Sequence, residues 1–166
     1  MTTMTINDKL EELGTLVNNT KQSLQRSGAE MIEAFFNTHK EGDNVDGETT
    51  AQLLYYLTDI QVRDYALGLL NVDNSDKFIS ALTHLINAAP EDSAYINPPS
   101  TLLSVMWYEM RDVEQAHAYL SKAKDGYALK QLLARVYAAG WDPSMFHAMR
   151  TELHPKVTAG IFGDNK

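Results

Sequence analysis

Residues 98–123 read PPSTLLSVMWYEMRDVEQAHAYLSKA, and this stretch decides the fold class. Proline is common in the first turn of a helix, so Pro98-Pro99 predicts a helix start. The apolar side chains that follow recur three and four residues apart, which is the helical period. They are Leu102, Leu103, Met106 and Trp107, and after the corner predicted at Arg111-Asp112 they are Ala116, Tyr119, Leu120 and Ala123. The stretch therefore predicts two helices joined by a tight turn.

The same period continues on both sides of this stretch. Helical apolar faces are predicted at residues 53–60, 62–70, 78–86, 127–137 and 145–149. Pro90 and Gly140 end two of these faces, and Asp142-Pro143 is a start signal for the last one. No segment shows the alternation of a strand between hairpin turns. The prediction is an all-α fold, an irregular array of antiparallel helical hairpins preceded by an N-terminal amphipathic helical segment.

The N-terminal segment carries an apolar stripe from Ile6 to Ala34 at alternating steps of four and three residues. Gly14 and Gly28 lie inside the pattern. Either one helix carries the whole stripe, or Gly28 divides two helices, at about Ile6–Gln25 and Ala29–His39. The stripe must be covered, either by this chain or by a second copy in a dimer, and the pattern favours neither. The side chains of the possible oligomer seam are Leu10, Leu13, Val17, Leu24 and Met31.

The segment EGDNVDG at residues 41–47 is the best candidate for a loop, with two glycines and no periodicity. Its acidic residues do not have the spacing of a calcium loop in any register. The sequence predicts two parts: residues 1–47, a helical segment with an acidic loop, and residues 48–166, a helical-hairpin repeat domain.

Internal repetition supports the hairpin array. Ala81, Leu85 and Ala88 recur 35 residues later as Ala116, Leu120 and Ala123, and Leu103, Ser104 and Trp107 recur 30 residues later as Leu133, Ala134 and Tyr137. Periods near 34 with small residues at helix crossings are typical of helical repeats. The segment from Leu103 to Ala123 resembles one tetratricopeptide repeat. It departs from that repeat at Arg111, where a small turn residue is usual, and at Ala128, where proline is usual.

A second resemblance involves the motif QVRDYAL at residues 61–67, the segment 102–112, GYAL at 126–129 and AAG at 138–140. With these motifs the chain resembles an uncharacterised actinobacterial family of unknown function, whose members join an α/β front half to a helical tail. The resemblance covers only the tail, about residues 50–150, and implies a helical module without known chemistry.

Composition excludes several classes of function. The formal net charge is −8, which argues against a protein that binds a phosphate backbone. The sequence has no cysteine, so disulfides, thiolate zinc sites and cysteine nucleophiles are excluded. No nucleophile-elbow or phosphate-binding glycine motif occurs. We expect neither a metal ion nor a cofactor, and the start of the chain does not have the pattern of a signal peptide, which predicts a cytoplasmic protein.

Aromatic residues recur through the second half of the chain. We expect Trp107 and Tyr137 in the core, and we expect Tyr108 and Trp141 at a surface, where aromatic rings anchor partners. The predicted partner-binding residues are Tyr108, Arg111 and Trp141. Arg63 is expected to pair with Asp59 four residues earlier, with Asp64 near a helix start.

These observations predict a non-enzymatic protein–protein interaction module of the helical-repeat type, which docks a protein or peptide and dimerises through its N-terminal helix if that stripe is not covered internally. One alternative is an acidic decoy or inhibitor whose carboxylates imitate nucleic-acid charge. A second alternative is a small hydrolase of unknown type, which would need a polar pocket containing a functional Glu or His.

Overall fold

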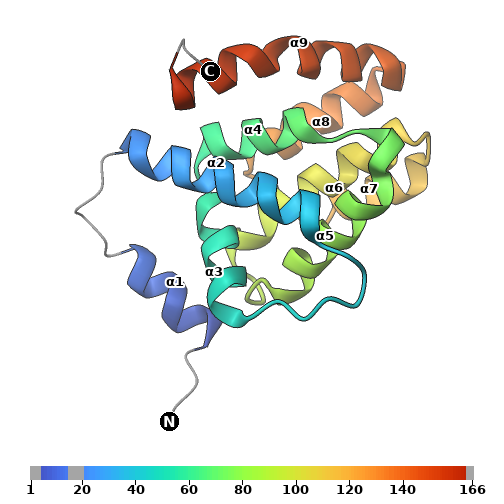
Figure 1. The fold of residues 1–166 in the computed structure, drawn as a ribbon. Helices are drawn as coiled ribbons and strands as arrows, with labels where there is room; N and C mark the ends of the chain where they lie inside the picture. Colours follow the sequence, from blue (N-terminus) through green and yellow to red (C-terminus); the bar gives the residue numbers. More distant parts are fainter. Residues whose placement is uncertain (1–4, 15–20, 164–166) are drawn as a thin grey trace.

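A computed structural model describes residues 5–14 and 21–163, and all nine regular elements longer than one turn within these ranges are α-helices (Figure 1). The α-helices are α1 (Ile6–Gly14), α2 (Lys21–Thr38), α3 (Gly47–Tyr56), α4 (Ile60–Leu69), α5 (Ser75–Ala88), α6 (Asn97–Glu109), α7 (Val113–Leu120), α8 (Ala128–Ala138) and α9 (Pro143–Phe162). Two short 3₁₀ turns lie at Val72–Asn74 and Ala94–Ile96. The described part of the chain contains no strand, which confirms the all-α prediction.

Aspartates set the starts of four helices. The carboxylates of Asp46, Asp59, Asp112 and Asp142 each accept a hydrogen bond from a backbone N–H in the first turn of α3, α4, α7 and α9. Such a side chain satisfies a donor that has no partner within the helix, and its negative charge favours the helix N-terminus. The start signal at Asp142-Pro143 is therefore confirmed.

Two helices end with the same turn, in which the backbone passes through the left-handed region. After α8, Gly140 has φ +68°, its N–H donates to the Tyr137 carbonyl, and the next N–H donates to Val136. After α6, Arg111 has φ +65° and the Asp112 N–H donates to the Trp107 carbonyl in the same way. Glycine adopts this conformation freely, whereas a side chain makes it unfavourable. Arg111 thus occupies a position that suits glycine.

The core is one continuous cluster of buried apolar side chains that reaches from Leu10 in α1 to Ile161 in α9. Helix α2 crosses the molecule and packs against α3, α4, α5 and α9 (Figure 1). The two parts expected at residues 1–47 and 48–166 therefore share this core.

Gly28 does not divide two helices, as the sequence suggested, because it lies in the middle of α2. A Cβ atom at Gly28 would be 2.9 Å from both Cβ and Cγ of Tyr56, so glycine allows α3 to approach α2 closely at this point. The described helices on either side of residues 15–20 are α1, which is described as far as Gly14, and α2, which is described from Lys21.

The apolar stripe of the N-terminal segment is partly covered within the chain. Leu10 is only 3% exposed, and α1 packs against α3. Met31 packs against the same core, and Leu24 is half-buried. The side chain of Leu13 and the whole of Val17 lie outside the described residues.

The hairpin predicted from residues 98–123 is α6 and α7, which make the most extensive contact between any two helices in the described structure. Every residue from Asn97 to Met106 is buried, because α5, α7, α8 and α9 all pack around α6. Tyr137 is buried as expected, and Trp107 packs against the core while remaining partly exposed. The repeat arrangement itself remains a prediction.

None of the described helices combines the length and the apolar character that crossing a membrane requires.

Candidate functional site

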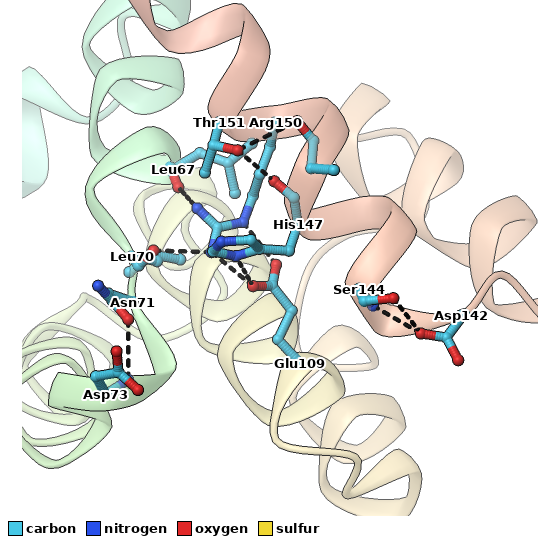
Figure 2. A network of polar contacts seen from close by, with 11 residues as sticks. Leu67, Leu70, Asn71, Asp73, Glu109, Asp142, Ser144, His147, Arg150 and Thr151 are labelled. Atoms are coloured by element: carbon cyan, nitrogen blue, oxygen red, sulfur yellow. Dashed lines mark hydrogen bonds and ion pairs between the residues drawn. The ribbon is translucent and has the colours of Figure 1, made fainter.

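The last helix is attached to the core by a buried ion pair. Arg150 of α9 donates from Nε to Oε2 of Glu109 and from Nη2 to Oε1, both at 2.6 Å, and each side chain is only 2% exposed (Figure 2). Glu109 is the last residue of α6. A bidentate pair fixes both distance and orientation, so it sets how α9 lies on α6.

Arg150 also caps the C-terminal end of a third helix, α4. Its Nη1 donates to the Leu67 carbonyl at 2.7 Å and its Nη2 to the Leu70 carbonyl at 2.8 Å, at the C-terminal end of α4 (Figure 2). The last carbonyls of a helix have no partner within it, and a cation there is favoured by the helix dipole. One guanidinium therefore joins α4, α6 and α9.

His147 lies one turn before Arg150 and extends this network toward the surface. Its Nδ1 is 2.8 Å from Oε1 of Glu109 and 3.0 Å from Nη2 of Arg150. The carboxylate is the acceptor among these groups, so the imidazole donates from Nδ1. This tautomer leaves Nε2 as an acceptor on a ring whose side chain is 42% exposed.

Beside His147 is a small open cleft of about 280 Å³. It lies where the turns after α4, α6 and α8 meet, and its lining residues are Asn71, Val72, Asp73, Glu109, Arg111, Pro143, Ser144 and His147. The cleft offers a cationic guanidinium, an imidazole and several hydrogen-bonding groups, together with the apolar surfaces of Val72 and Pro143. Such a lining suits a short polar segment of another molecule.

The rim of the cleft is organised by Asp142. Its Oδ1 accepts hydrogen bonds from the Ser144 N–H at 2.9 Å and the Ser144 hydroxyl at 2.6 Å, and Arg111 lies 3.2 Å from the same carboxylate. The contacts with Ser144, and then with Arg111, lower the pKa of Asp142 to about 2. The Ser144 hydroxyl thus donates to a carboxylate at the start of its own helix.

The structure brings the three predicted partner-binding residues together. The Tyr108 hydroxyl donates to the Trp141 carbonyl, and Arg111 pairs with Asp142, the residue that follows Trp141. Arg111 lines the cleft, and the Trp141 side chain is 37% exposed. Tyr108 and Arg111, near the end of α6, thus meet Trp141, which lies 30 positions after Arg111 in the sequence. We call the place where these three residues meet the corner.

The expectation that Tyr108 lies at the surface is wrong. Tyr108 is 4% exposed and stacks on Tyr137, with 4.2 Å between the ring centroids. It lies on α6, whose buried position leaves little of the ring exposed to solvent. Tyr108 supports the corner from beneath, and burial raises the pKa of its hydroxyl.

Arg63 has other partners than the sequence suggested. It pairs with Asp64 at 2.8 Å and donates to the Tyr127 hydroxyl at 3.2 Å, while Asp59 is the residue that caps α4. The carboxylate of Asp59 caps the first turn of α4. Arg63 instead contacts the neighbouring Asp64 and, in the segment before α8, Tyr127.

A larger hollow, of about 670 Å³, lies between α5 and the loop that follows α2. At this place His39 and His84 lie 5.6 Å apart between ring centroids, and His84 Nε2 is 2.9 Å from the Thr50 hydroxyl. Burial, and then the neighbouring His39, lower the pKa of His84. Among the residues that the structure describes, no group of three or more His, Cys, Asp or Glu side chains is arranged to hold a metal ion.

Sequence reasoning missed Glu109, His147 and Arg150. A signal for Arg150 was present, because it lies four residues after Phe146 and so shares its buried helix face. For Glu109 the signal was its position at the end of a helix that is apolar on every side. Nothing in the sequence linked the two residues, which are 41 positions apart.

The chain matches a protein family over residues 3–144, and that family is described as a domain of unknown function, DUF4192. The match extends further toward the N-terminus than the segment 50–150 that resembled a family in the sequence, and it ends at the start of α9. No curated protein and no solved structure matches the chain. Because the match covers most of its 166 residues, the protein belongs to the DUF4192 family, whose function is unknown.

Proposed function

We propose that the protein is a non-enzymatic interaction module of the helical-repeat type, and that it docks a protein or peptide partner at the corner formed by Arg111, Trp141 and the cleft beside His147. The observation that carries the proposal is the backbone of Arg111, which is held at φ +65° at the rim of the cleft. A non-glycine residue in this region costs about 1–2 kcal/mol. Such strain is found preferentially where a side chain has a task.

The chemistry of the corner supports a partner with an extended polar segment. Arg111 and Asp142 are both largely exposed, with 64% and 49% of their side chains accessible, so their ion pair can be exchanged for contacts with a partner. Trp141 supplies an aromatic surface, and Met145 nearby in α9 is 59% exposed. Arginine and tryptophan are enriched among the residues that dominate binding energy.

Quantitative affinity capture from native lysate tests the proposal with matched variants. Captured proteins are compared for the wild type, Trp141→Ala, Arg111→Gly and a control, Leu132→Ala, whose side chain on α8 is 44% exposed. We expect one set of partners to be lost from both corner variants and retained by Leu132→Ala. Retention of every partner by both corner variants would contradict a docking site at this corner.

The alternative of an acidic decoy depends on a continuous stripe of carboxylates. Three carboxylates, those of Glu41, Asp43 and Asp76, line the larger hollow. Lys40 and Lys77 also line this hollow, so the charge there is mixed. The affinity of a decoy for its partner would fall steeply as the salt concentration increases from 50 to 300 mM. The affinity of a partner that docks at the corner is expected to depend only weakly on salt.

The alternative of a small hydrolase draws on the cleft, because Glu109 orients His147 and leaves Nε2 as an acceptor. A hydrolase would also need a nucleophile beside that nitrogen. Ser144 donates its hydroxyl to Asp142 instead, which favours a binding role for the cleft.

A dimer through the N-terminal stripe is a separate proposal. It requires the apolar side chains that the chain does not cover itself, of which Leu24 is the half-buried example. Sedimentation at high micromolar concentration, with wild type and Leu13→Asp compared, tests it. A wild-type monomer that the substitution leaves unchanged would contradict it.

A further inference from the structure

The C-terminal half of α9 is attached to the rest of the molecule by contacts of a different kind from those at Arg150. His154 places its ring directly over Gly68 of α4, where a Cβ atom would be only 2.0 Å from Nδ1. The same ring packs against Tyr65, with 5.1 Å between centroids, and the Tyr65 hydroxyl donates to Glu33 of α2 at 2.7 Å. A single imidazole thus lies at the junction of α2, α4 and α9.

The nitrogen that faces this junction has no partner. Nδ1 of His154 is buried and makes no hydrogen bond. A protonated imidazole carries a proton on both nitrogens, so protonation would place an unsatisfied N–H and a positive charge in this contact. The closed arrangement therefore requires the neutral ring.

The charged and titratable groups around His154 do not stabilise the protonated ring enough to change this. Burial lowers the pKa of His154, the Glu33 carboxylate opposes that shift in part, and Arg150 on the same helix adds to it. The carboxylate of Glu33 already accepts from Tyr65, whose own pKa is raised by burial and by that carboxylate. The ring is consequently neutral when α9 is docked near neutral pH.

The next residue is a proline within α9, which continues through it. Pro155 lies inside α9 and has no N–H, so the helix lacks the hydrogen bond that this position would donate to Thr151. Before Pro155, α9 is fixed by Arg150 and Phe146, which are almost fully buried. After Pro155, α9 is held by the buried Ile161 side chain and by Val157 and Phe162, which pack against the core. The Ile161 carbonyl also accepts from Nε of Arg26 at 3.0 Å and from Nε2 of Gln22 at 3.5 Å.

We propose that residues 155–162 form a strap, a segment that can bend away from the molecule at Pro155. The neutral ring of His154 holds this strap against α4, and protonation of the ring at acidic pH releases it. Protonation favours the state in which the imidazole reaches water, so release increases as the pH falls below about 6.5, the ordinary pKa of histidine. Release uncovers the faces of α4 and α2 that α9 covers in Figure 1. The first half of α9 remains docked through Arg150.

Hydrogen exchange of the full chain at pH 7.5 and pH 5.5, corrected for the intrinsic pH dependence of exchange, tests the strap. We expect residues 156–162 to lose protection several-fold at pH 5.5, and by a larger factor than residues 102–106 in the buried helix α6. His154→Phe, which keeps a planar ring and cannot be protonated, is expected to abolish the difference. His117→Asn, at an exposed histidine of α7, is the matched control and should behave as the wild type.

Two further variants keep the test decisive if His154→Phe disturbs packing. Gly68→Ala fills the space under the ring and should give low protection of residues 156–162 at both pH values. Pro155→Ala restores the missing hydrogen bond and so removes the hinge. Residues 143–154 and 155–162 should then lose protection from hydrogen exchange together. An unchanged strap in the acidified wild type, an acid effect that survives His154→Phe, or full protection in Gly68→Ala would each overturn the proposal.

Discussion

Arg150 and Glu109 form a bidentate pair with both N–O distances at 2.6 Å, and both side chains are almost fully buried. The pair joins the last helix to the most deeply buried one. Two further N–H groups of the guanidinium donate to carbonyls at the C-terminal end of α4, so this pair links three helices.

Breaking this pair on one side should be severely destabilising. Arg150→Met leaves a buried carboxylate without its cation, and Glu109→Leu leaves a buried guanidinium without its anion. We expect each to lower the free energy of unfolding by about 3–5 kcal/mol. The double variant should recover a large part of the loss, because no charge then remains uncompensated. Urea unfolding of the four proteins measures the coupling. The control is the pair Lys130–Asp125, whose carboxylate is fully exposed, and Asp125→Ala should change the free energy of unfolding little.

Arg111→Gly should separate stability from binding. Glycine adopts φ +65° without strain, so the variant is expected to gain up to about 1 kcal/mol in the free energy of unfolding. The same change removes a guanidinium from the rim of the cleft, and partner binding should weaken. A variant that is less stable than the wild type would show that the ion pair with Asp142 outweighs the backbone strain.

Gly28→Ala should be destabilising although alanine is the better helix former. The added Cβ meets Tyr56 at 2.9 Å, and forcing α2 away from α3 is expected to cost about 1–3 kcal/mol. Gly126 is the matched control, because a Cβ there meets nothing within 4 Å. Thermal unfolding of both variants should show a lower Tm for Gly28→Ala alone.

Ser104 and Tyr137 share a buried hydrogen bond at the junction of α6, α7 and α8. The serine hydroxyl donates to the Ala116 carbonyl at 2.6 Å and lies 2.9 Å from the Tyr137 hydroxyl, whose pKa burial raises. Ser104→Ala leaves the tyrosine hydroxyl and the carbonyl without this partner and should cost about 1–3 kcal/mol. Ser104→Ala combined with Tyr137→Phe should cost less than the two single changes added together, as measured by urea unfolding.

Stability should decrease as the pH falls from 7.5 to 5.5. His84 has a lowered pKa in the folded state because of burial and of His39, so the unfolded chain binds more protons in this range. The stability that the neutral ring contributes is complete above about pH 6.5 and is lost progressively below it. His84→Gln should reduce the pH dependence of the urea midpoint. His117→Gln, at an exposed histidine, should leave the pH dependence unchanged.

The helices and several of their ends could be predicted from the amino-acid sequence. Apolar spacing identified α3 to α9, and proline, glycine and aspartate placed several of their boundaries, because these signals act within a few residues of chain. Gly28 shows the limit of such reasoning. Its absent side chain suggests a helix break locally, whereas in the fold it is explained by Tyr56, 28 positions later.

Contacts between side chains of different helices could not be predicted in this way, because they depend on tertiary packing. The predicted residues Arg111 and Trp141 share a corner because α6 and α8 end with the same turn, yet Tyr108 is buried since α8 and α9 close over α6. Glu109, His147 and Arg150 come together only when α9 packs against α6. Helical periodicity specifies the face of one helix, and the pairing of faces depends on the packing of the whole chain.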